Sequence, residues 1–167
     1  PLYIYNAKTN TLIISKDQRG TAVIESRLPE LKVYLLEICQ IKRIFYNNLD
    51  DEANTGTLTF TCNGNVPGKL YIENDEDKSA ITGFSDISYE YQLTVIEPDS
   101  AVYRKGQMMY AEKDEEGNPT GNFIVANKVT IGQTIVPTTK EETITFSEDQ
   151  LVEKDEEGNV KTDEEGN

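Results

Sequence analysis

The fold class depends on RLPELKVYLLEICQIKRIFYNN, residues 27–48, because both kinds of regular secondary structure are compatible with this stretch. Apolar residues recur there at the three- and four-residue spacing of one helix face, namely Leu31, Leu35, Ile38, Ile41 and Phe45. Pro29 suits the first turn of a helix, and Ser26 lies close enough to contribute to a cap. The spacing therefore predicts a helix over residues 29–46.

The same stretch also has features of β-strands. Val33, Tyr34, Ile44 and Tyr46 give it high strand propensity and would leave apolar side chains on the far side of a helix. A helix here would be buried on more than one face or would serve as a contact surface. Because tyrosine is enriched in protein interfaces, the candidate contact residues are Tyr3, Tyr5, Tyr34, Ile44 and Tyr46. Ordinary sheet packing, with the hydroxyl at the rim, is the alternative for tyrosines in strands.

Short β-prone runs separated by turn residues occupy most of the remaining chain. LYIY, the polar loop NAKTN and TLIIS predict an N-terminal hairpin. Residues 56–147 have the pattern of about seven or eight strands, which is typical of a sandwich or barrel. One of these runs, SYEYQLTVIE, alternates strictly and predicts a single strand that ends before Pro98. We expect a mainly β fold, an antiparallel sandwich or barrel-like domain with one helix.

A short acidic segment occurs three times in the chain. EKDEEGN occupies residues 112–118 and 153–159, and DEEGN occupies residues 163–167. Acidic residues followed by Gly-Asn predict a three-residue hairpin loop, because Gly117 and Gly158 adopt positive φ without steric cost. The first copy would join MMYAEK to NFIVANK, and the second would form a short ribbon. We expect a β-rich anchor domain over 1–147 and an acidic hairpin or extended tail over 148–167.

Charge and hydropathy exclude several partners. The chain carries 30 acidic against 16 basic residues, a net charge of -14, which disfavours binding to nucleic acid or to an anionic membrane. No window approaches the roughly 18 apolar residues that a membrane helix needs. The start PLYIYNAKTN lacks a basic region followed by an apolar run, so no signal peptide is expected and the protein would be made in the cytoplasm.

The residue types needed for common catalytic sites are missing. The chain contains no histidine, which removes Ser-His and Cys-His nucleophile pairs, and its two cysteines are too few for a histidine-free zinc site. We expect Cys39 and Cys62 to be buried free thiols, although a disulfide is open if the fold brings them together. A carboxylate pair for glycoside hydrolysis cannot be located among so many acids. We therefore expect no enzyme and no cofactor.

One stretch has partial calcium-loop spacing. In DEDKSAITGFSD, the residues Asp75, Asp77, Ser79 and Asp86 occupy the first, third, fifth and twelfth positions of such a loop. Ala80 stands where the turn needs glycine, and the last position lacks the usual glutamate. A solvated acidic loop is therefore favoured over a weak calcium site.

In composition and organisation the chain resembles accessory virion proteins of tailed bacteriophages, of the head-fibre and capsid-decoration type found in crAss-like phages. The stretches that carry the resemblance are PLYIYN, TIVPTTKEETITFSEDQL and the EKDEEGN units. The resemblance implies attachment of the β domain to capsid or other assembly proteins, self-association as a homodimer or homotrimer, and a final location in the virion.

Two other function classes remain open. An acidic cytosolic inhibitor or nucleic-acid mimic would bind a basic groove on another protein, since a net charge of -14 would speed that encounter. However, half of the excess negative charge lies in the last twenty residues and not on one rigid face. A secreted ligand-binding β-sandwich is the third class, and it predicts a bridge between Cys39 and Cys62.

Overall fold

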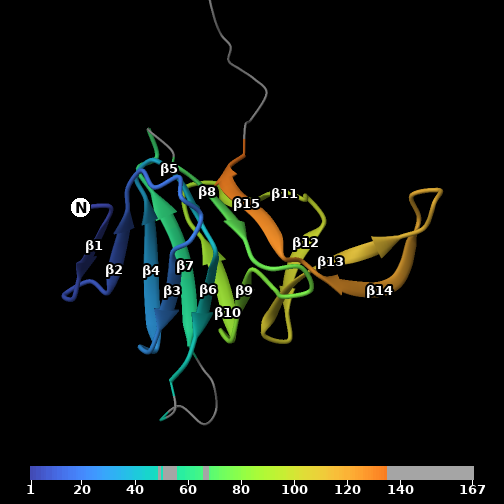
Figure 1. Cartoon of the computed structure of the whole chain (residues 1–167), viewed down its shortest axis with the longest axis horizontal. Helices are drawn as coiled ribbons and strands as arrows, with labels where there is room; N and C mark the ends of the chain where they lie inside the picture. The colour runs from blue at the N-terminus through green and yellow to red at the C-terminus, as the bar shows by residue number, and fades with distance from the viewer. Residues whose placement is uncertain (49, 51–55, 66–67, 135–167) are drawn as a thin grey trace, which may run out of the picture. The chain divides into compact units, whose positions relative to one another are not determined.

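The computed structural model describes residues 1–48, 50, 56–65 and 68–134, and all regular structure in this part is β-strand (Figure 1). These residues belong to one compact unit that ends at Thr134. The predicted boundary at residue 147 and the later copies of the repeat lie outside the described residues. The strands are β1 (Tyr3–Asn6), β2 (Thr11–Ile14), β3 (Val23–Ser26), β4 (Glu30–Leu35), β5 (Ile38–Ile41), β6 (Arg43–Tyr46), β7 (Thr57–Cys62), β8 (Lys69–Glu73), β9 (Ile81–Thr82), β10 (Asp86–Tyr89), β11 (Leu93–Glu97), β12 (Ala101–Arg104), β13 (Gln107–Lys113), β14 (Pro119–Val125) and β15 (Lys128–Gln133).

The strands form three sheets. Sheet 1 has the order β1-β2-β4-β7-β10, sheet 2 the order β11-β15-β8-β5, and sheet 3 the order β12-β13-β9-β6-β3, with β14 paired to β13. Along the chain, β4, β5 and β6 belong to sheets 1, 2 and 3 in turn. Strands β7, β8 and β9 follow the same order, and each pairs with the preceding strand of its sheet. We call this winding the coil and each passage of the chain through the sheets a rung. Rung 1 contains β2 and β3, rung 2 contains β4, β5 and β6, and rung 3 contains β7, β8 and β9.

Neighbouring rungs pair in parallel, as in a parallel β-helix. The expected mainly β fold is confirmed, but the expectation of antiparallel pairing is wrong for the coil. Parallel partners lie a full rung apart in sequence, so no tight turn marks them. Antiparallel pairs occur at the N-terminal hairpin of β1 and β2, which is confirmed, and in the region after β10.

The predicted helix over 29–46 is wrong, because the structure has β4, β5 and β6 there. Within β4, Leu31, Val33 and Leu35 are buried in strict alternation, and the pairing of β4 with β2 and β7 satisfies its backbone groups on both sides. The helical spacing arises because three short strands, each burying alternate residues, follow one another around corners. Ile38 distinguishes the two structures, because its side chain would be buried on the apolar face of a helix but is exposed in β5.

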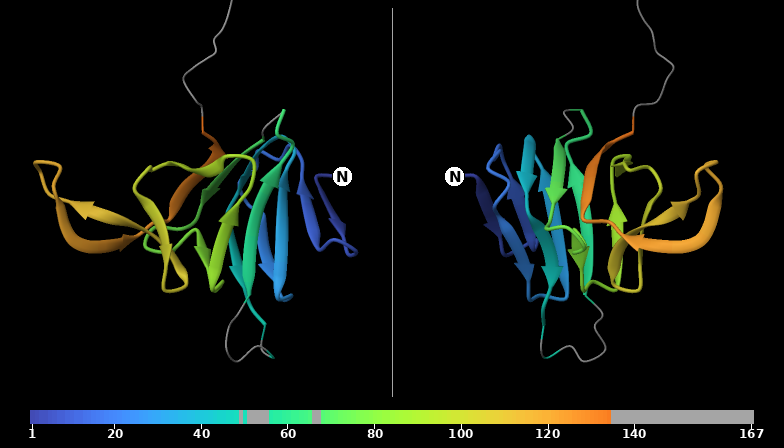
Figure 2. Two further views of the ribbon diagram at one scale, coloured as in Figure 1. Left: turned by 180° about the vertical axis from the view of Figure 1, so that it is seen from behind. Right: turned by 45° about the vertical axis from the view of Figure 1, so that its right-hand side comes forward.

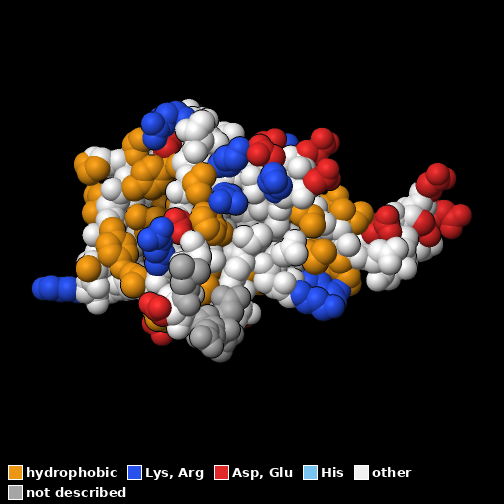
Figure 3. Space-filling model, turned by 60° about the horizontal axis from the view of Figure 1, so that its bottom comes forward, with side chains coloured by type: hydrophobic (Ala, Val, Ile, Leu, Met, Phe, Trp, Pro, Cys, Tyr) orange, Lys and Arg blue, Asp and Glu red, His pale blue; other side chains and the backbone are white. Residues whose placement is uncertain are grey.

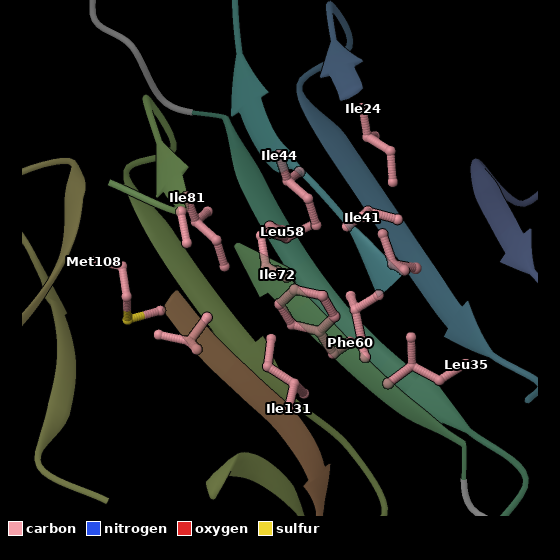
Figure 4. Packing of buried hydrophobic residues seen from close by; sticks show 14 of the residues in the cluster. Ile24, Leu35, Ile41, Ile44, Leu58, Phe60, Ile72, Ile81, Met108 and Ile131 are labelled. Atoms are coloured by element: carbon pink, nitrogen blue, oxygen red, sulfur yellow. The ribbon is translucent and has the colours of Figure 1, made fainter. Parts of the chain in front are cut away.

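The core consists of side chains that stack from rung to rung (Figure 4). Parallel pairing without a shift places apolar residues opposite apolar residues, since the burial alternates with the same phase in each strand. The stacked pairs include Val33 with Phe60, Leu35 with Cys62, Cys39 with Leu70, Ile41 with Ile72 and Ile44 with Ile81. Each rung therefore buries its inner face against the next.

After β10, the chain leaves the coil and returns antiparallel. Strand β10 still pairs in parallel with β7 in sheet 1, whereas β15 pairs antiparallel with β8 in sheet 2 and β13 meets β9 antiparallel through Gln107 and Thr82 in sheet 3. The β13–β14 hairpin extends away from the coil (Figure 2). The turn predicted at EKDEEGN joins these two strands, with Gly117 at a φ of 86°, and is confirmed.

The single strand predicted for SYEYQLTVIE is divided in two. Strand β10 ends at Tyr89 and β11 begins at Leu93, because Tyr91 and Gln92 adopt positive φ and turn the chain from sheet 1 to sheet 2. The end before Pro98 is confirmed. Among the described residues there is no helix of the length and apolarity that a membrane crossing requires.

Candidate functional site

The acidic calcium candidates do not converge. The Asp75 carboxylate accepts a hydrogen bond from Lys42 Nζ at 2.8 Å, and this bond holds its pKa below the ordinary range. Asp77 is exposed in the loop at a φ of 70°, whereas Asp86 opens β10 beside Thr57. Within the described ranges, no group of three or more Asp, Glu, Cys or His is placed to hold a metal ion.

Ser79, the fourth calcium candidate, is buried and has a structural role. Its hydroxyl accepts a hydrogen bond from the Met108 N–H at 2.9 Å and lies 2.9 Å from the Ile81 carbonyl, to which it can donate. These bonds link the start of β9 to β13, where Met108 enters the core. The hydroxyl is therefore used by backbone groups and does not face a cation.

Two of the five contact candidates are core residues. Ile44 is completely buried, and Tyr46 is buried with its ring centroid 5.5 Å from that of Phe84. Their assignment to a contact surface is wrong, because the helix that would have exposed them is a strand of rung 2. Tyr34 is half-buried on the outer face of sheet 1, and Tyr5 is exposed with its hydroxyl donating to the Asn10 side-chain oxygen.

Tyr3 belongs to a structural cluster around Asp17. Its hydroxyl donates to Asp17 Oδ2 at 2.6 Å, and Arg19 donates to both carboxylate oxygens at 2.8 and 2.9 Å. Asp17 is almost fully buried, and the Arg19 and Tyr3 hydrogen bonds hold its pKa far below the ordinary range. Because the Asp17 carbonyl accepts from the Gln40 N–H, the cluster fixes β1 and the sheet 2 side of rung 1.

The two cysteines are buried free thiols, as expected. Cys39 lies in β5 of sheet 2 and Cys62 in β7 of sheet 1, and burial raises the pKa of each thiol. Neither has the exposed, low-pKa environment of a reactive cysteine. The bridge that the secreted alternative predicts is therefore not formed.

The acids of the EKDEEGN hairpin are partly used by the turn itself. Asp114 Oδ1 accepts the N–H groups of Glu116 and Asn118, each at 2.9 Å, and the Asp114 carbonyl accepts from Gly117 at 3.0 Å. The carboxylate therefore closes the loop in the way that aspartate stabilises turns. This geometry explains the first copy of the repeat without any bound cation.

One end of the coil is open. Strands β1 and β3 are the terminal strands of sheets 1 and 3 at rung 1, and apolar side chains gather on this side of the molecule (Figure 3). A groove of about 330 Å³ runs between β1, β2 and β3. Its lining includes Tyr5, Leu12, Ile24 and Leu28. The exposed large apolar residues at this open end are Leu2, Ile4, Tyr5, Val23 and Leu28.

The free edge of β3 carries paired charges. Glu25 Oε2 accepts from Asn47 Nδ2 at 2.8 Å and from Arg27 Nε at 3.1 Å, and these bonds lower the pKa of Glu25. The Ser26 carbonyl bonds to β6 through the Asn47 N–H. Because alternate residues of a strand direct their backbone groups to opposite edges, those of Val23 and Glu25 face the free edge, and Arg27 directly follows the end of the strand.

The open end is the part of the site that the sequence did not reveal. TAVIES is visible as a β-prone run, but nothing in it shows that β3 would be a terminal strand. Comparisons with protein-family models, with curated proteins and with solved structures find no match for this chain. Function is therefore inferred from the geometry of the chain's own residues.

Proposed function

We propose that the protein is a non-enzymatic structural module that self-associates through the open end of its coil, as an accessory component of a virion such as a head fibre or capsid decoration. The observation that carries this proposal is the open end itself. Proteins built from stacked repeats need a polar terminal repeat to remain soluble alone. Here rung 1 instead ends in β3, which pairs with β6 on one side and leaves its other edge free beside an apolar groove.

The occupant of the open end is a second copy of the chain. Most homo-oligomers are two-fold symmetric, and a two-fold axis at an edge strand pairs the strand antiparallel with its own copy. In an antiparallel pair, residues opposite one another either both direct their backbone groups to the partner strand or both direct them away, so Glu25 can lie opposite Val23, Glu25 or Arg27 but not opposite Ile24 or Ser26. Only one of these three registers places a residue of opposite charge, Arg27 of the second copy, opposite Glu25.

Charge selects among these registers. Like charges directly opposite one another destabilise a strand pair, whereas opposite charges stabilise it. Glu25 therefore faces Arg27 of the second copy, and this contact occurs twice. The same register brings Leu28, which follows β3, close to Ile24 of the second copy, and both residues line the groove at the open end.

Charge reversal tests this interface. The mass of each protein is measured by light scattering during size-exclusion chromatography. We expect the unmodified chain to be a dimer, and we expect Glu25→Arg and Arg27→Glu each to shift it to monomer because like charges then face each other. The double variant restores opposite charges and with them the dimer.

Lys105→Glu is the matched control, because Lys105 is exposed in the turn between β12 and β13, and the dimer should persist. Thermal unfolding of each variant verifies that the monomer still folds. An unmodified chain that is monomeric at every concentration would overturn the proposal. A dimer that survives Arg27→Glu would contradict the register, because Arg27 lies opposite Glu25 in the proposed register alone.

A further inference from the structure

A second groove lies on the outer face of sheet 1 and shares no lining residue with the groove at the open end. It has a volume of about 720 Å³, within the range of small-ligand sites. Outward-facing residues of β2, β4 and β7 form its floor, among them Thr11, Tyr34 and Thr61. Tyr91, in the turn between β10 and β11, contributes to its wall.

Tyr91 is held in a conformation that keeps its ring out of the core. Tyr91 is the most exposed large apolar residue of the described part, at 57% exposure. Its φ is 56°, and the φ of the next residue, Gln92, is 62°. Positive φ is costly for residues other than glycine and persists where surrounding bonds enforce it. Gln133 Nε2 donates to the Tyr91 carbonyl at 2.9 Å, and the Thr134 N–H donates to the Gln92 carbonyl at 3.0 Å.

The ring of Tyr91 also lies close to the backbone of Gly64. A Cβ at Gly64 would lie 3.2 Å from Cδ1 of Tyr91, so the ring packs directly on the backbone of Gly64. The turn and the glycine together hold a flat aromatic surface at the groove. A strained, hydrogen-bonded turn that exposes an aromatic ring is a feature of binding sites and not of core packing.

The polar groups of the groove are neutral or paired. Lys32 Nζ lies 3.8 Å from the Glu90 carboxylate, so the two charges offset each other. The side-chain oxygen of Asn63 accepts the Asn65 N–H at 2.9 Å, and that of Asn6 accepts the Lys8 N–H at 3.0 Å. Within the described residues, the side-chain NH₂ groups of Asn63 and Asn6 therefore remain as hydrogen-bond donors for a ligand in the groove.

We propose that this groove binds a neutral oligosaccharide. Amide donors, threonine hydroxyls and a neutral ion pair match the closely spaced hydroxyl groups of a sugar, and the Tyr91 ring offers a surface for its apolar C–H face. Among the described residues that line the groove, Lys32 is the one cation, and an anionic ligand would find it already paired with Glu90. A peptide added as a strand would need a free sheet edge, whereas β4 and β7 are paired on both sides.

An array of neutral, sulfated and sialylated oligosaccharides tests the proposal, with isothermal titration of each oligosaccharide that binds. We expect the full chain to bind neutral oligosaccharides. Tyr91→Ala should weaken that binding about tenfold, since one aromatic contact is worth up to that factor. Tyr71→Ala is the matched control, because Tyr71 is an exposed tyrosine on β8 of sheet 2, and binding should not change.

Absence of binding to every neutral oligosaccharide on the array would overturn the proposal. Binding that Tyr91→Ala leaves unchanged, or binding to sulfated and sialylated oligosaccharides alone, would do the same. The result is independent of self-association, because the charge variants Glu25→Arg and Arg27→Glu lie outside this groove and should bind the same sugars.

Discussion

The coil and the β13–β14 hairpin are both made of strands, but they differ in what holds them together. Phe60, in β7 of the coil, is completely buried, whereas Phe123, in β14 of the hairpin, is 39% exposed. The strands of the coil pair with partners a full rung away, and the strands of the hairpin pair with each other across one short turn. The hairpin is therefore encoded locally, whereas the coil depends on contacts between distant residues.

This difference predicts where substitutions act. Loss of a large side chain from the coil leaves a cavity that several rungs share, because the inner side chains are stacked. Loss of a side chain from the hairpin removes a partly solvated contact that few other residues share. The variants below start with the largest expected effect.

Phe60→Ala should lower the free energy of unfolding by about 3–5 kcal/mol, the usual cost of removing a fully buried phenylalanine side chain. Phe60 stacks on Tyr89, with ring centroids 5.8 Å apart, and Val33 lies opposite it in β4. Chemical denaturation followed by circular dichroism measures the change. Phe60→Leu is the control, because it keeps most of the apolar volume and should cost much less. Equal losses for both variants would show that the ring does not fill a tightly packed site.

The Asp17 cluster should make the stability of rung 1 depend on pH. Because the folded-state pKa of Asp17 is depressed, its contribution is complete above the unfolded-state pKa of about 4 and is lost as the pH falls below that value. Asp17→Asn should therefore unfold at lower denaturant concentration at neutral pH, and the gap to the unmodified chain should narrow below about pH 4. Tyr3→Phe should cost about 1–2 kcal/mol at neutral pH, since it removes one hydrogen bond to a carboxylate.

Glu76→Gln, in the exposed loop between β8 and β9, serves as the control for loss of one negative charge at the surface. Its denaturation midpoint should remain close to that of the unmodified chain. A gap for Asp17→Asn that stays constant from neutral to acidic pH would contradict the proposed role of the ionised carboxylate.

Local features of the fold were predictable from the sequence, and distant ones were not. The hairpin of β1 and β2 and the turn at EKDEEGN follow from residues that are neighbours in the chain. The spacing over residues 30–46 predicts a helix although the structure has three strands there, because one buried residue every three or four positions satisfies both a helix face and strands that bend around corners. Only pairing with the parallel partners β2, β7, β8 and β9 distinguishes the strands from a helix. No pattern within residues 30–46 indicates which distant segments these partners are.

The candidate sites show the same division. Tyr5 was predicted as a contact residue and does lie at the open end, because its exposure follows from a terminal hairpin. Glu25 and Arg27 were missed, since their importance depends on β3 being a terminal strand of sheet 3. Tyr91 was assigned to a continuous strand, and the positive φ that places it in a groove comes from hydrogen bonds to residues 133 and 134.

Gly117→Ala should destabilise the hairpin by about 1 kcal/mol while leaving the coil unchanged. The glycine has a φ of 86°, where an alanine Cβ is strained, and no heavy atom lies within 4 Å of a Cβ built there. Hydrogen exchange of individual amides measures the effect, and faster exchange is expected in β13 and β14 but not in β4 or β7. Glu116→Ala, one residue earlier in the turn, is the control and should have little effect.

The smallest effect is expected for Phe123→Ala, at about 0.5–1 kcal/mol. The Arg104 guanidinium lies 3.9 Å from the centroid of the Phe123 ring, and a cation–π contact of this exposure has about that value. Chemical denaturation measures the loss, and Arg104→Ala should produce a similar one because it removes the other half of the contact. A loss close to that of Phe60→Ala would mean that the hairpin is buried in solution by a further contact. Since the described fold leaves β14 with one strand partner and an exposed face, this substitution distinguishes a hairpin that stabilises only itself from one that is covered in an assembly.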